Sequence, residues 1–148
     1  MIEVIRCDLE PTPTYAARAC VWVTLGTGEV EVKDAAGGWG RVPADGKLTV
    51  KVQRGHGYGL ACELDTYAVS EEPSAYPGVR RFLLLSLTDP GQREPYAVQV
   101  GGGAAAGCRC RAGRCGADCK HAAAVAAVLA EGGMADTAYR RAGGGDAA

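Results

Sequence analysis

Long apolar runs are missing from this chain of 148 residues, although 47% of the residues are hydrophobic. A bilayer-spanning helix needs about 18 or more consecutive apolar residues, so the sequence predicts no transmembrane helix. The first six residues also lack a basic segment followed by an apolar stretch, so we expect no secretory signal. With 22% charged residues, the composition favours a packed, soluble core, and the lack of an export signal favours the cytoplasm.

Histidine is scarce, with two residues in the whole chain, and the motifs of common catalytic sites are missing. One histidine belongs to the metal motif described below, so a Ser/His/Asp nucleophile set cannot be assembled. The glycines at 101–103 do not belong to a G-x-G-x-x-G or G-K-[ST] pattern, which a nucleotide-binding loop needs. We therefore expect a protein that is not an enzyme, and a hydrolase or redox enzyme stays as a weaker alternative.

Cysteine, by contrast, occurs seven times. The number is odd, no export signal is visible and most of the cysteines cluster near a histidine, so metal-bound thiolates in a reducing compartment are a better interpretation than disulfides. Cys7, Cys20 and Cys62 lie in apolar or alternating segments, where we expect buried core residues.

The strongest local pattern is C-x-C-x8-C-x-H, formed by Cys108, Cys110, Cys119 and His121. Three thiolates and one imidazole are a donor set that a closed tetrahedral zinc site uses. The residues around these cysteines are Gly and Arg rather than apolar, which argues against cysteines that serve only as small core residues. An alanine-rich run follows and predicts a helix from about residue 120 to 131.

The spacing of the four residues has a geometric consequence. In an extended backbone, residues i and i+2 point the same way, so Cys108 and Cys110 can bind one ion from a single edge. In a helix the same spacing diverges, so Cys119 should precede the helix and His121 should lie in its first turn. We expect Asp118 or Cys119 to cap the first helical amides.

These residues resemble the SWIM zinc finger, which is written C-x-C, a variable spacer and C-x-H, at the end of a ββα unit. The β-prone segment 96–100 and the apolar segment 122–129 are similar to the strand and the helix of that unit, and the resemblance covers about residues 80–134. It implies that Cys108, Cys110, Cys119 and His121 bind one structural Zn²⁺, in a module that binds DNA or another protein. Cys115, inside the spacer, departs from the pattern and keeps an iron–sulfur cluster as a minor alternative.

Charge is unevenly distributed, with a net −4 over residues 1–78 and +3 over residues 79–148. Four basic side chains surround the metal motif: Arg109, Arg111, Arg114 and Lys120. They could contact the phosphates of a nucleic acid. They could also only offset the negative charge of a zinc–trithiolate centre, in an adaptor that binds another protein.

We predict an α+β protein in which a mostly antiparallel β region is followed by a C-terminal ββα SWIM-like zinc finger. The expected division is a β-rich region of unknown role at 1–78, the finger at 79–134 and a partly disordered tail at 135–148. Alternation and β-propensity predict strands at 2–7, 19–25, 29–33, 48–52, 58–67, 80–88 and 96–100. Residues 101–107 are expected to form a flexible approach to the metal motif.

Overall fold

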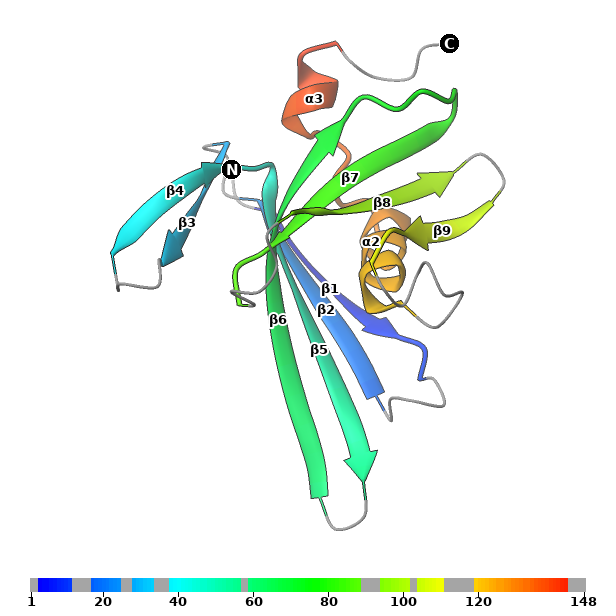
Figure 1. Cartoon of the computed structure of the whole chain (residues 1–148). Coiled ribbons are helices and arrows are strands. Elements are labelled where there is room, and N and C mark those ends of the chain that lie inside the picture. The colour runs from blue at the N-terminus through cyan, green and yellow to red at the C-terminus, as the bar shows by residue number, and fades with distance from the viewer. Residues whose placement is uncertain are drawn as a thin grey trace.

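The computed structural model describes residues 3–11, 17–24, 28–33, 38–56, 59–88, 94–101, 104–110 and 119–143. Seven antiparallel strands form one sheet in the order β1-β2-β5-β6-β7-β8-β9, and β3 and β4 form a separate hairpin (Figure 1). The strands are β1 (Glu3–Leu9), β2 (Ala17–Thr24), β3 (Glu29–Lys33), β4 (Trp39–Pro43), β5 (Gly46–His56), β6 (Gly59–Glu72), β7 (Val79–Ser86), β8 (Tyr96–Gly101) and β9 (Ala104–Cys108). The helices are α2 (Lys120–Ala130) and the short α3 (Ala138–Arg141).

One face of the sheet forms the main core, because alternate residues of each strand point to the same side. In β5 these residues are Leu48, Val50 and Val52, all at most 1% exposed. The pairing register places Trp22 of β2 and Tyr67 of β6 beside Leu48, so the buried row continues across the sheet. Trp22 is fully buried, as expected for a tryptophan in a β-prone segment.

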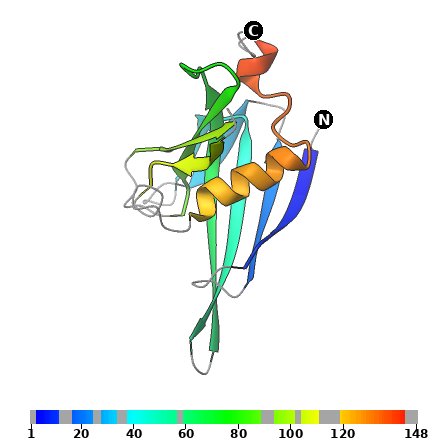
Figure 2. The same cartoon turned by 90° about the vertical axis from the view of Figure 1, so that its right-hand side faces the viewer.

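Helix α2 covers this face (Figure 2). It contacts β1, β2 and β5 in one half of the sheet and β8 and β9 in the other. Ala124, Val125 and Val128 are fully buried and belong to the same core cluster as the strand residues. The helix therefore completes the core of the whole sheet, not only that of its own hairpin.

The β3–β4 hairpin packs on the opposite face. Val30 and Ala44 are buried against Ala68 of β6, and Val42 and Leu85 pack around them. Ala68 and Leu85 are cross-strand partners, and in both strands the neighbouring residues point to the α2 side. The sheet therefore has a large core beneath α2 and a small one beneath the hairpin.

Gly46, at the start of β5, allows the Trp22 side chain to lie directly against the backbone. A Cβ atom at Gly46 would lie 2.5 Å from the carbonyl oxygen of Val23 and 2.7 Å from the Trp22 ring. We expect Gly46→Ala to lower the free energy of unfolding by about 1–3 kcal/mol, because the ring or the strand must shift. At exposed Gly40 a Cβ would meet only Val32 Cγ2, at 3.8 Å. Gly40→Ala is thus the matched control in a denaturant titration, expected within about 0.5 kcal/mol of wild type. Equal effects of the two substitutions would contradict this account.

Most predicted strands are present, and two were missed. β3 has the predicted bounds, and helix α2 ends one residue before the predicted end. The prediction of a flexible approach at 101–107 was wrong for residues 104–107, because β9 pairs there with β8. β4 was also not foreseen; its Gly and Pro residues weaken the strand pattern.

The three cysteines outside the metal motif differ in burial. Cys7 and Cys20 are buried, as predicted, and they are cross-strand partners beneath α2. Burial raises the pKa of Cys20 to about 12, which keeps this thiol neutral. The prediction of a buried Cys62 was wrong, because Cys62 is exposed. Its position in β6 alternates with that of Tyr67, so it points to the face that α2 does not cover.

The strands on the two sides of residue 78, where the sequence predicts a domain boundary, belong to one sheet. β6 pairs with β7 from Tyr67↔Ser86 to Glu72↔Arg81. The predicted tail, 135–148, includes α3 and the buried Thr137, and residues 144–148 lie outside the described part. The division of the chain at residue 78 stays a prediction.

Candidate metal centre

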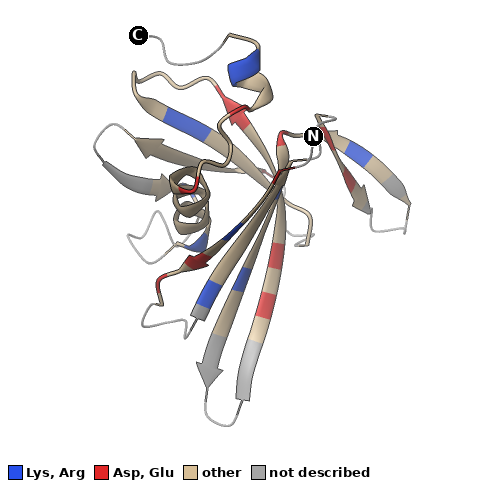
Figure 3. Cartoon of the chain, turned by 180° about the vertical axis from the view of Figure 1, so that it is seen from behind, with Lys and Arg blue, Asp and Glu red and all other residues tan. Residues whose placement is uncertain are grey.

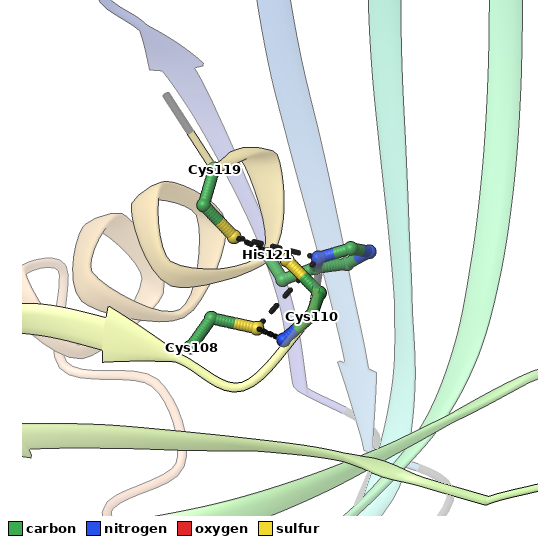
Figure 4. Close-up of side chains that lie close together, drawn as sticks. All are labelled: Cys108, Cys110, Cys119 and His121. Atoms are coloured by element: carbon green, nitrogen blue, oxygen red, sulfur yellow. Dashed lines mark hydrogen bonds between the residues drawn. The ribbon is translucent and has the colours of Figure 1, made fainter. Parts of the chain in front are cut away.

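The four residues of the C-x-C…C-x-H pattern converge at the entrance of helix α2 (Figure 4). Cys108 is the last residue of β9, and Cys110 follows two residues later. Cys119 is the N-cap residue of α2 and has an extended backbone, and His121 is the second helical residue. The predicted placement of Cys119 before the helix and of His121 in its first turn is confirmed. Cys119 makes no side-chain cap hydrogen bond, and Asp118, the other predicted cap, lies outside the described residues.

The donor atoms lie within 4.8 Å of one another. The Sγ atom of Cys119 is 3.5 Å from Nδ1 of His121, and Sγ of Cys108 is 3.8 Å from the same nitrogen. The Sγ atoms of Cys110 and Cys119 are 3.3 Å apart. All four side chains thus point to one small space.

These separations fit a tetrahedral metal site. Zinc binds sulfur at about 2.3 Å and imidazole nitrogen at about 2.0 Å, which places two ligand sulfurs about 3.8 Å apart and a sulfur and a nitrogen about 3.5 Å apart. The two sulfur–nitrogen distances lie close to that value, and the sulfur–sulfur distance is shorter. The donor set and its geometry therefore suit one divalent ion held by three cysteines and one histidine.

The centre is enclosed by protein. Cys110 and His121 are 4% and 7% exposed, and Cys108 and Cys119 are half-buried. Four protein ligands fill a tetrahedral coordination sphere, so such an ion would keep no position for a reacting water. An arrangement of this kind suits a structural role.

Two tyrosines of the sheet hold the imidazole of His121. The hydroxyl of Tyr67, in β6, is 2.8 Å from Nε2, on the side of the ring opposite to the sulfurs. The Tyr67 ring meets the imidazole edge-on at a centroid distance of 5.1 Å, and the Tyr96 ring of β8 lies 4.8 Å away at a tilt. These contacts fix the ring so that Nδ1 faces the cysteines.

The thiols are arranged to favour a negative sulfur at Cys119. The hydrogen bond from the Cys108 thiol and the contact with His121 together lower the pKa of Cys119 to about 3, although burial opposes the shift. The pKa of Cys108 is raised, first by its hydrogen bond to Cys119 and then by burial. A divalent cation would favour the thiolate form of all three cysteines, because metal ligands must be deprotonated.

The predicted basic patch is only partly described. Arg109 is exposed, and its backbone N–H donates to the carbonyl of Ala97. Lys120 is in direct contact with the carboxylate of Asp65, and its side chain is 18% exposed. Arg111, Arg114 and Cys115 lie outside the described residues. Among the residues that Figure 3 colours, charges form separate bands, and along α2 the one charged residue is Lys120.

Sequence reasoning missed Asp65 and Tyr67, which lie more than fifty positions before their partners Lys120 and His121. They are two residues apart in β6 and therefore share the face that α2 covers. A strand with an aspartate and a tyrosine two positions apart is an ordinary pattern in a half-exposed sheet. The sequence pattern therefore held no signal that assigns them to the metal centre.

Comparison with known protein families, with curated proteins and with solved structures gives no match for this chain. Among the helices of the described residues, none has the length and apolar character needed to cross a membrane.

Proposed function

We propose that this chain is a zinc-stabilised binding module of the SWIM type, and not an enzyme. The observation that carries the proposal is the convergence of Cys108, Cys110, Cys119 and His121 within 4.8 Å. Zinc is favoured over an iron–sulfur cluster, because these clusters mostly use four cysteines and the set here includes an imidazole. Reduced cysteines are needed for such a site, which agrees with a cytoplasmic location.

The proposed role of the ion is to join β9 to the start of α2. Cys108 and Cys110 lie at the end of the strand, and Cys119 and His121 lie at the entrance of the helix. A metal bond between the two pairs holds α2 over the core residues of five strands. Zinc would thus stabilise the fold, and the surface around it would be available for a partner.

Metal content tests this proposal directly. Protein purified under reducing conditions should contain about one zinc per chain in elemental analysis, as expected for a closed four-ligand site. Iron accompanied by about one inorganic sulfide per iron would indicate a cluster instead. Protein that takes up no stoichiometric metal when zinc is supplied would refute the proposed function.

Nucleic acid is the first candidate partner, since Arg109 is exposed between two of the ligands. Arg111 and Arg114 belong to the same basic segment of the sequence. Lys120 supports this candidate less, because Asp65 already pairs with it. The second candidate is a protein partner, in which case the arginines only offset the charge of the zinc–thiolate centre.

Salt dependence distinguishes the two candidates. If the arginines contact phosphates, the affinity for duplex DNA should fall steeply with salt. Arg109→Ala should then flatten the slope of log K against log salt by about 0.9, and an Arg111/Arg114 double alanine variant by about 1.8. Lys120→Gln is the matched control and should leave the slope nearly unchanged, because this ammonium group is already paired. An adaptor would show no DNA binding even at low salt.

A further inference from the structure

Two side chains of β6 contact consecutive residues at the entrance of α2. Asp65 binds the ammonium group of Lys120, and the hydroxyl of Tyr67 is 2.8 Å from Nε2 of His121. In the strand the two residues are separated by one position, so both point to the helix. The start of α2 is therefore held to the sheet on the side opposite to the cysteines.

Tyr67 lies where the two halves of the sheet meet. It pairs with Leu48 of β5 on one side and with Ser86 of β7 on the other. Its side chain is 3% exposed, and its hydrogen bond with His121 is buried. A residue paired on both sides within a sheet is a rigid support for a ligand.

The orientation of the imidazole leaves distinct roles for its two nitrogens. Nδ1 faces Cys108 and Cys119, and Nε2 faces Tyr67 (Figure 4 shows the ring pointing away from α2 toward the strands). When Nδ1 binds a metal, the proton of the neutral imidazole is on Nε2. The Nε2–H group then donates a hydrogen bond to the hydroxyl oxygen of Tyr67. Hydrogen bonds of this kind fix the tautomer and orientation of a ligating histidine, and their loss typically weakens metal binding 10–100-fold.

We propose that Tyr67 is a positioning residue of the metal centre, which fixes His121 with Nδ1 toward the ion and makes metal affinity depend on the β6 strand. The proposal rests on the proposed zinc site and adds a residue that lies outside the segment resembling a SWIM finger. The centre is then shared between that segment and the N-terminal part of the sheet. The ββα segment alone would hold the ion more weakly than the complete chain does.

Metal competition on the full chain tests the proposal. We expect Tyr67→Phe, which removes one oxygen atom and keeps the ring, to weaken Zn²⁺ binding about 10–100-fold in a chelator titration. Tyr76→Phe is the matched control, because it removes the same oxygen atom from a tyrosine that is 66% exposed and does not belong to the cluster. We expect the control to bind zinc within about threefold of wild type, a smaller change than the weakening of about 10–100-fold expected for Tyr67→Phe. Circular dichroism of each variant saturated with zinc checks that the fold is retained, which separates a loss of metal affinity from a general loss of structure.

A second measurement needs no substitution. In ¹⁵N spectra of the wild-type chain loaded with zinc, the His121 ring should show a metal-bound Nδ1 and a protonated Nε2. A metal-bound Nε2 would overturn the proposal, as would wild-type affinity in Tyr67→Phe. If the wild-type chain binds no metal, the proposed zinc site itself fails, and that outcome is distinct from the other two.

Discussion

Replacing Cys110 with serine is expected to remove stoichiometric zinc and to unfold the chain well beyond the finger. Structural zinc contributes on the order of 10 kcal/mol to the folding of small domains, and a whole domain is stable by only about 5–15 kcal/mol. Cys110 is 4% exposed within the cluster, so a serine there leaves three ligands and an enclosed hydroxyl. The substitution therefore removes a large part of the total stability.

The effect should reach the whole sheet because of the position of α2. Val125 and Val128 of the helix are fully buried, and the helix contacts strands of both halves of the sheet. If the helix is no longer held at its entrance, these residues and the sheet core beneath them become exposed to water. The packing of α2 therefore predicts a global loss of cooperativity, and not disorder confined to the C-terminal segment.

Thermal unfolding followed by circular dichroism measures this effect. Cys110→Ser and wild type treated with a zinc chelator should both lose the cooperative transition of the zinc-loaded protein. Cys62→Ser is the matched control, since Cys62 is an exposed cysteine that does not belong to the cluster. It should keep one zinc and the wild-type transition. A Cys110→Ser variant with unchanged zinc content and midpoint would contradict the assignment of Cys110 as a ligand.

The second large effect is expected at Glu71, which lies in a buried ion pair on the side of the sheet that leads to α3. Its carboxylate accepts two hydrogen bonds from Arg80, at 2.8 and 2.9 Å, and one from Thr137, at 2.5 Å. Arg80 also donates to the carbonyl of Met134 at 2.6 Å. The Glu71 side chain is 2% exposed, so it links β6, β7 and the C-terminal segment within a nearly dry environment.

We expect Glu71→Gln to lower the free energy of unfolding by about 3–5 kcal/mol at pH 7, because it leaves the partly buried guanidinium of Arg80 without its counter-charge. The exposed pair Arg41–Glu29 offers a matched control, with side chains 63% and 48% exposed and a separation of 3.6 Å. Glu29→Gln should change stability by less than about 1 kcal/mol. Denaturant titrations of the zinc-loaded proteins measure both differences. Similar losses of unfolding free energy in the two variants would show that the buried Glu71–Arg80 pair stabilises the fold no more than the exposed pair does.

The difference between wild type and Glu71→Gln should also depend on pH. Burial alone would raise the pKa of Glu71, but hydrogen bonds from Arg80 and Thr137 outweigh it, and the pKa is lowered. The stabilisation by the carboxylate is therefore complete above the unfolded-state pKa of about 4.3 and is lost as the pH falls through the lower folded-state value. Acid also releases zinc, so both proteins are compared in the same buffer at each pH. A difference that grows below about pH 4.3 would contradict this sign.

The sequence by itself determined the features that depend on a few neighbouring residues. The C-x-C and C-x-H spacings are enough to place Cys108 with Cys110 and to put Cys119 before a helix that begins at Lys120. The spacing acts through local backbone geometry, which is extended on one side and helical on the other. The alternation of charged and apolar residues that predicts β3 is also a pattern among neighbouring residues.

The tertiary structure decided what those elements touch. Residues 104–108 have the weak β-propensity of Ala and Gly, and they form β9 because β8 offers a free edge to pair with. Tyr67 meets His121, and Glu71 meets Arg80 and Thr137, only because the register of β6 turns these side chains to the same face. Pairing register depends on how distant strands bury their apolar rows together, and one residue of slip would reverse every side chain. The candidate ligands of the centre can therefore be read from local spacing, whereas the residues that support them depend on the assembled sheet.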